Sequence, residues 1–236
     1  MSFPGKEGNT EKMIRSPDEL LSWVHKIGFL PLFSNQIHGF SVEEHTVASD
    51  WWSGNPSSDP WVWRQILASD DSVAYGKFFD FKAGFVSRSW FPVLANFRRD
   101  GYDFEGMYED GKLKHKAKQV MEALMPDENM YSKTMLSSDL HKQSGVVKAF
   151  ETTLSSLQMQ TFLIVNGFKQ KRNKSGLPYG WHVAEITTPE TKWGYEEVNG
   201  IRERTEDSRD KIYKQILLYY PDTEDAYLDK VLGIRR

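Results

Sequence analysis

The chain has 236 residues, a net charge of −3 at pH 7 and no cysteine. This length can bury a hydrophobic core without disulfide or metal support, and the lack of cysteine excludes thiolate ligands, a cysteine nucleophile and thiol redox chemistry. No segment approaches the roughly 20 apolar residues of a membrane span, and residues 1–15 lack the apolar stretch of a secretion signal. We therefore expect a cytoplasmic protein that does not enter a membrane.

Helix signals mark the start of the chain. Residues 1–15 are rich in glycine and charge, and we expect them to be disordered. Ser16-Pro17-Asp18-Glu19 forms a capping box with proline at the first helical position, and Gly28 ends the apolar pattern. Residues 29–58 show few periodic signals. Asp59 is a second N-cap candidate and is followed by proline, as at the first helix, so the sequence predicts a helix over 60–67.

Alternating side chains predict strands after this helix. Residues 73–81 alternate with a period of two, and Lys82-Ala83-Gly84 is interpreted as a turn into a second strand from Phe85. A helix that ends at Arg99 follows and is closed by Gly101. Asp110-Gly111 marks a boundary, so the first lobe is expected to span residues 16–110.

Aromatic residues are concentrated in this first lobe. They suit a stacking pocket for a nucleobase, and interspersed cations at Arg64, Lys77, Lys82 and Arg88 suit a nucleic-acid face. Large aromatics more often build an ordinary core, which is the interpretation we favour. The cluster comprises Trp51, Trp52, Trp61, Trp63, Tyr75, Phe78, Phe79, Phe81, Phe85, Trp90 and Phe91.

The segment from 132 to 186 predicts two short helices and a β-hairpin. Ser137-Ser138-Asp139 offers caps for the first helix, and after Gly145 a helical stripe from Phe150 to Thr161 indicates the second. Residues 162–165 and 179–186 are rich in β-branched and aromatic side chains, which indicates two strands. This is the outline of a winged helix-turn-helix. We expect an α+β fold with a winged-helix lobe over 111–200 and a C-terminal helical clasp over 201–236.

The tip of the predicted hairpin is basic, which favours duplex DNA as a partner. The net charge argues against a protein wrapped in nucleic acid over its whole surface, so local charge matters more. The Asn166-Gly167 pair is an alternative turn that would move the tip away from the cations. The cationic stretch 112–118 is interpreted as a solvated helix face. The candidate DNA-binding residues are Lys169, Lys171, Arg172 and Lys174.

Gln158-Met159-Gln160 lies where the predicted second helix meets the hairpin. Residues two apart in a helix point about 200° apart, so the two amides can act on one site only if the helix ends near Leu157. Such a pair more commonly solvates a helix end. A carboxylate is the stronger base for hydrolysis, and the sequence does not rank the available ones, Asp80, Asp103, Glu105 and Glu185.

Several segments resemble the proteins related to AlkZ, a family of winged-helix DNA glycosylases. The resemblance is carried by Leu157-Gln158-Met159-Gln160 within the winged-helix outline, and by the segments 61–64, 75–79 and 96–103. In those glycosylases, a Gln-x-Gln or Gln-x-Asp motif is thought to hold the hydrolytic water and steady the sugar cation, and the substrates are alkylated or crosslinked bases. The resemblance thus implies that Gln158 and Gln160 are catalytic residues for excision of damaged bases.

No histidine pair has metal-site spacing and no glycine motif for a nucleotide is present, so we expect neither a metal nor a cofactor. Two other functions stay open. One is a noncatalytic DNA-binding or regulatory module whose aromatic lobe binds a small ligand or a partner. The other is a protein-interaction scaffold that does not contact DNA, which the acidic charge balance permits.

Overall fold

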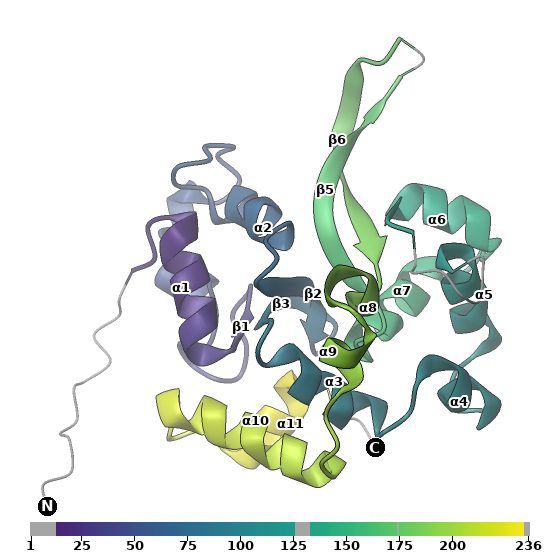
Figure 1. Ribbon diagram of the computed structural model, residues 1–236. Coiled ribbons are helices and arrows are strands. Elements are labelled where there is room, and N and C mark those ends of the chain that lie inside the picture. Colours follow the sequence, from purple (N-terminus) through teal and green to yellow (C-terminus); the bar gives the residue numbers. More distant parts are fainter. Residues whose placement is uncertain (1–12, 126–132, 174, 234–236) are drawn as a thin grey trace, which may run out of the picture.

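The computed structural model describes residues 13–125, 133–173 and 175–233 (Figure 1). The described residues combine helices with one six-stranded antiparallel sheet in the order β1-β3-β2-β5-β6-β4, which confirms the α+β class. The strands are β1 (Phe29–Pro31), β2 (Val73–Phe79), β3 (Lys82–Ser87), β4 (Met135–Leu136), β5 (Ile164–Arg172) and β6 (Pro178–Thr187).

Helices surround this sheet. In the described residues they are α1 (Pro17–Ile27), α2 (Pro60–Ala68), α3 (Phe91–Arg99), α4 (Phe104–Glu109), α5 (His115–Leu124), α6 (Ser137–Ser144), α7 (Phe150–Met159), α8 (Pro189–Trp193), α9 (Tyr195–Asn199), α10 (Thr205–Tyr219) and α11 (Asp225–Val231).

The predicted helix starts at Pro17 and Pro60 are confirmed. Ser16 and Asp59 are the residues before them, and each side chain accepts a hydrogen bond from a main-chain N–H in the first helical turn. Thr188 caps α8 in the same way. A polar cap followed by proline fixes a helix start because the cap satisfies an otherwise unpaired N–H and proline needs no acceptor there.

The turn between β2 and β3 comes earlier than the sequence indicated. Asp80 and Phe81 form it with φ of 48° and 63°, and β3 begins at Lys82, so Lys82-Ala83-Gly84 is strand and not turn. Phe79 pairs with Lys82 across the two-residue turn. Two central residues with positive φ give the turn whose twist matches the flanking strands, even where neither residue is glycine.

The alternative turn at Asn166-Gly167 is wrong. β5 continues through this pair, because Val165 pairs with Ile186, Gly167 pairs with Glu185, and the register shifts between the two pairs. The extra residue forms a bulge, and Gly167 has a φ of 148°. The chain therefore reverses beyond Arg172, as the basic-tip interpretation expects.

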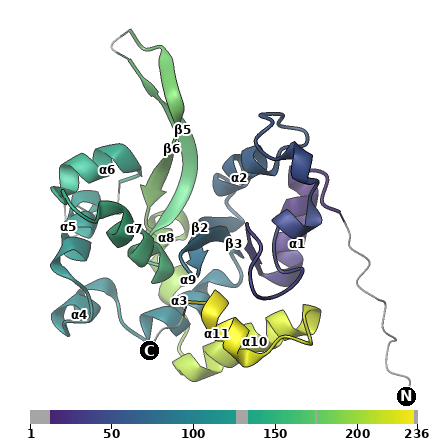
Figure 2. The same cartoon turned by 180° about the vertical axis from the view of Figure 1, so that it is seen from behind.

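The β5–β6 hairpin projects from the body between α2 on one side and α6 on the other (Figures 1 and 2). Its base belongs to the main sheet, since Tyr75 of β2 pairs with Val165 of β5. The elements before it follow the order α5, β4, α6, α7, and β4 pairs with the inner end of β6. The predicted pair of short helices before the hairpin is thus present.

Most of the aromatic cluster is core, as favoured from the sequence. Trp63, Phe78, Phe79, Phe85 and Phe91 are among the largest fully buried side chains. Among the described residues of this cluster, Trp52 and Phe81 are the exposed members. A stacking pocket formed by the whole cluster is therefore excluded.

The C-terminal helix α10 packs against α3 and α1. α10 lies along α3, and Gln215 donates a hydrogen bond from Nε2 to the carbonyl of Ile27 at 2.9 Å. At the other end of the chain, residues 1–12 lie outside the described ranges, whereas Ile14 is buried and its N–H donates to the carbonyl of His45 at 2.7 Å. Within the described residues, no helix has the length and apolar content to cross a bilayer.

Candidate functional site

The base of the hairpin is anchored to α2. The guanidinium of Arg64 lies 3.6 Å from the ring centre of Trp61 and 4.3 Å from that of Phe168 in β5. Arg64 is buried between these rings, so it belongs to an internal cation–π stack and not to a nucleic-acid face. Burial lowers its pKa, and the tyrosine hydroxyl of Tyr75 opposes that shift.

The outer half of the hairpin is exposed on both strands. Exposure begins at Lys169 in β5 and extends in β6 from Pro178 to His182. β5 has nine residues and therefore reaches about 30 Å at roughly 3.3 Å per residue. The hairpin thus holds its tip well away from the sheet in which it is rooted (Figure 1).

A second bulge interrupts this exposed half. Gln170 pairs with His182 and the next residue, Lys171, pairs with Tyr179, so β6 has two extra residues, Gly180 and Trp181. Gly180 has a φ of 73° and its carbonyl accepts a hydrogen bond from Nε2 of Gln170 at 3.0 Å. Trp181 is 93% exposed. In a regular strand, side chains alternate between the two faces; the bulge points this indole in a different direction.

The four predicted DNA-binding cations have different environments. Nζ of Lys169 lies 2.7 Å from Oε1 of Glu185 in a salt bridge. Lys171 is half-buried opposite Tyr179, and Arg172 is exposed and donates from Nη1 to the carbonyl of Gly176 at 2.8 Å. Lys174 lies outside the described residues.

The cations noted in the first lobe are mostly engaged within the protein. Arg88 forms salt bridges with Asp71 and Glu197. Nζ of Lys77 donates to Oγ of Ser155 at 2.9 Å. Arg64, Lys77 and Arg88 are thus engaged within the protein. Lys82 is the exposed member of the four, so the group does not form a continuous basic face.

Gln158 points into the protein. It is 3% exposed, and its Oε1 accepts a hydrogen bond from the main-chain N–H of Lys77 in β2 at 2.8 Å. The absence of a side chain at Gly76 makes room for this contact, because a Cβ there would lie 3.2 Å from Oε1 of Gln158 and 2.8 Å from the ring of Phe78. Gln158 therefore fixes α7 against β2.

Gln160 is the C-terminal cap of α7 and is half-buried. Its Oε1 is shielded from solvent and has no hydrogen-bond donor among the described residues. α7 extends to Met159, and Gln160 keeps near-helical angles of −81° and 5°. Because the helix does not end near Leu157, the two amides lie on different sides of α7 and not on one extended face.

Two arginines of α3 fix the end of α7. Nη1 of Arg98 donates to the carbonyl of Met159 at 2.8 Å. Arg99 donates from Nη2 to the carbonyl of Thr161 at 2.6 Å and from Nε to its Oγ1 at 3.2 Å. Thr161 has a φ of 64°, which is strained for a β-branched residue and persists only where surrounding contacts impose it.

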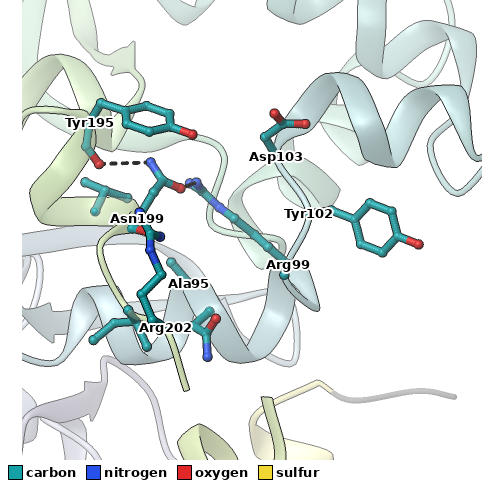
Figure 3. A pocket seen from close by; sticks show the side chains of 11 residues that line it. Ala95, Arg99, Tyr102, Asp103, Tyr195, Asn199 and Arg202 are labelled. Atoms are coloured by element: carbon teal, nitrogen blue, oxygen red, sulfur yellow. Dashed lines mark hydrogen bonds between the residues drawn. The ribbon is translucent and has the colours of Figure 1, made fainter. Parts of the chain in front are cut away.

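A polar pocket of about 170 Å³ lies beside these contacts. Figure 3 shows Arg99 and Asn199 directed toward each other, and Nη1 of Arg99 donates to Oδ1 of Asn199 at 2.8 Å and to Glu190 at 2.6 Å. The pocket is smaller than the roughly 300–1,000 Å³ of typical ligand sites. It is lined by Ala95, Asn96, Arg99, Gly101, Tyr102, Asp103, Tyr195, Val198, Asn199, Ile201 and Arg202.

Lys192 in α8 is the one lysine of the described chain whose pKa is lowered, to about 8. Burial is the largest cause, and the carboxylates of Asp71 and Asp70 oppose it. Its Nζ donates to the carbonyls of Asp70 at 2.7 Å and Val73 at 3.0 Å. These contacts make it a structural cation, since its protons are already shared with the main chain. The described residues contain no group of three or more metal-ligating side chains.

The family model described as AlkZ related matches residues 14–233. The chain belongs to the AlkZ-related family. The match covers nearly the whole length of this AlkZ-related protein, and the membership suggests a function of the DNA-repair kind. Comparisons with curated proteins and with solved structures gave no match.

Sequence reasoning missed two features of this AlkZ-related chain. Trp181 was interpreted only as part of a strand, although the preceding glycine within a strand pattern is a signal for a bulge. The role of Arg98 and Arg99 could not be read from the sequence, because the segment that they hold lies about 60 residues away along the chain.

Proposed function

We propose that this AlkZ-related protein binds duplex DNA through the β5–β6 hairpin, with α6 and α7 as the helix pair of a winged helix-turn-helix. The observation that carries the proposal is a projecting hairpin with a net positive charge and an exposed outer half. From Ile164 to Thr187 the sequence has four cations and a single carboxylate, Glu185, which is already paired with Lys169. Cationic wings contact DNA phosphates in winged-helix proteins, and phosphate contacts supply most nonspecific affinity.

The helix pair adds to this support. Lys148 is exposed two residues before the start of α7, and Lys142 is exposed on α6. A second helix that enters the major groove places its N-terminal residues near the bases and its flanking residues near phosphates. The family membership is consistent with this partner.

The test is the salt dependence of duplex-DNA affinity for wild type and for the double variant Lys171→Ala, Arg172→Ala. We expect weaker binding and a log–log salt slope shallower by about two, because each lost phosphate contact removes about 0.9 from the slope. The matched control is Arg204→Ala, Lys214→Ala, on the α10 side of the molecule away from the hairpin (Figure 1). Equal slopes for both variants would refute the hairpin as the DNA contact.

Base excision is the second proposed activity, with Gln158 and Gln160 as the site residues. Water would add to C1′ of the sugar while the N-glycosidic bond breaks and the base leaves with a proton. The specific support is the amide oxygen of Gln160, a shielded acceptor without a donor among the described residues, on a segment held by Arg98 and Arg99. Such an acceptor can orient a water, while Gln158 holds the helix in place.

This activity is tested by base release from a randomly methylated duplex, with DNA binding recorded on the same substrate. We expect wild type to release bases and Gln160→Ala to lose release while it retains binding. Binding without release by wild type would establish a noncatalytic DNA-binding module instead. If wild type neither binds DNA nor releases bases, a DNA function is rejected. Small ligands of the N-terminal half would then be screened, for example by thermal shift.

A further inference from the structure

Trp181 is the most exposed large apolar side chain in the described part of the chain, at 93%. Leu177 and Tyr179 nearby in β6 are also exposed, at 63% and 51%. Exposed tryptophan is uncommon on a surface without a partner, because the indole is the side chain that gains most from burial in an interface. The hairpin therefore presents an apolar group at the same level as its cations.

The backbone of the bulge determines where the side chain of Trp181 lies. The two-residue bulge lies between the pairs Gln170–His182 and Lys171–Tyr179, and Gly180 supplies the positive φ that the bulge requires. The amide of Gln170 closes the bulge from the opposite strand by its hydrogen bond to the carbonyl of Gly180. A bulge that is held from across the hairpin aims a side chain in a fixed direction.

The charges around the indole select the kind of partner. Lys171 and Arg172 lie on the strand opposite the bulge, and the only carboxylate of the hairpin sequence, Glu185, is nearer the base and paired with Lys169. A partner must therefore carry negative charge beside a flat apolar group. Nucleic acid has both, since phosphates flank stacked bases, and a two-stranded β-ribbon fits a groove of B-DNA.

We propose that Trp181 is a wedge that inserts into a base step of duplex DNA and unstacks it. The proposal rests on the DNA binding proposed above and specifies how the hairpin acts on the duplex. Apolar wedges inserted between base steps open and kink DNA, and the cost of unstacking is offset by the added contacts. An opened step also eases extrusion of a base, which any chemistry on a base within a duplex requires.

The experiment uses duplexes that contain 2-aminopurine, whose fluorescence rises when its stacking is lost. Wild type, Trp181→Ala and Trp181→Phe are each added to saturation, and affinity is measured separately by anisotropy. Trp52→Ala is the matched control, because Trp52 is another exposed tryptophan, at 65%, outside the hairpin. Trp181 is solvent-exposed, so its replacement should leave the melting temperature unchanged.

We expect wild type and Trp52→Ala to raise the fluorescence, and Trp181→Phe to retain part of the rise. Trp181→Ala should bind on the order of tenfold more weakly and give no rise at saturation, in line with the loss of one aromatic stacking contact.

An equal rise with Trp181→Ala, or tight binding by wild type without any rise, would overturn the wedge while DNA binding stands. Failure of wild type to bind duplex DNA would overturn both proposals. Binding of the hairpin to anionic lipid vesicles in preference to DNA, lost in Trp181→Ala, would replace the wedge by a membrane contact.

Discussion

The main-chain N–H of Lys77 donates a hydrogen bond to Oε1 of Gln158 at 2.8 Å, across 81 positions of the sequence. The bond joins β2 to α7, the helix that precedes the hairpin. It distinguishes the two glutamines of the motif, since Oε1 of Gln160 meets no donor among the described residues. One amide is therefore structural by its contacts, and the other has a shielded oxygen without a partner among the described residues.

Gln158→Ala should destabilise the protein more than Gln160→Ala. The first change leaves a part-buried main-chain N–H without its acceptor, which costs about 1–3 kcal/mol. The second removes an acceptor that has no partner among the described residues, so its effect should stay within about 0.5 kcal/mol. Urea unfolding followed by circular dichroism measures both values. Equal losses in the two variants would contradict the division of roles between the amides.

Arg99→Met should be among the most damaging substitutions in the chain. It breaks the salt bridge with Glu190, removes a donor to Asn199 and leaves the buried carbonyl of Thr161 without this donor, at a cost of about 3–5 kcal/mol. Arg202→Met is the control from the same pocket, because Arg202 is exposed and should cost about 0.5 kcal/mol or less. Thermal unfolding of both variants tests this, and similar melting temperatures would show that Arg99 does not hold the motif.

Local signals predicted much of the fold. The caps at Ser16 and Asp59 fixed two helix starts, and the change of period at Phe162 located the hairpin. The turn before β3 was predicted too late in the sequence because Phe81 adopts a positive φ, which phenylalanine rarely does. Asn166-Gly167 gave the opposite error, because a turn-forming pair was accommodated as a bulge inside a paired strand.

The candidate site was less accessible from the sequence. The basic residues of the hairpin can be identified in the sequence. The salt bridge between Lys169 and Glu185 cannot, because it depends on the register of β5 against β6. A catalytic role for the motif at Gln158 was implied by a resemblance, and the contacts that hold the motif come from β2 and α3. Such tertiary contacts leave no local pattern, which is why the difference between Gln158 and Gln160 required the structure.

Lys192 should make stability depend on alkaline pH. Its pKa is lowered from 10.5 to about 8 by burial, so between these values the unfolded chain binds more protons than the folded chain. The free energy of unfolding should therefore rise as the pH increases from 8 toward 10.5, and below pH 8 the cost of burying the charge is fully present. The gain is on the order of 1–2 kcal/mol between pH 7 and 9.5.

The measurement compares wild type with Lys192→Met across this range by urea unfolding. Other groups titrate in the same window and affect both proteins, so the difference between the two curves isolates Lys192. The advantage of wild type over the variant should grow with pH. Parallel curves would show that Lys192 keeps its ordinary pKa in the folded protein.

Glu185→Gln should strengthen DNA binding. The change removes the one carboxylate of the hairpin sequence and releases Lys169 from its salt bridge at 2.7 Å. A released lysine can contact one more phosphate, so the log–log salt slope should become steeper by about one. Anisotropy titrations over a salt series measure this, with Glu206→Gln in α10 as a control of equal charge change. An unchanged slope would mean that Lys169 does not face the bound DNA.

The most direct test of the account removes the exposed half of the hairpin. Phe168 and Ala184 are a cross-strand pair, so residues 169–183 can be replaced by an Asn-Gly turn that joins this pair and keeps the anchor of Phe168 on Arg64. The shortened protein should keep its melting temperature, because the removed residues are largely exposed, and its duplex-DNA affinity should fall at least tenfold. A shortened protein that folds and binds duplex DNA as tightly as wild type would contradict the central claim that the hairpin is the DNA contact.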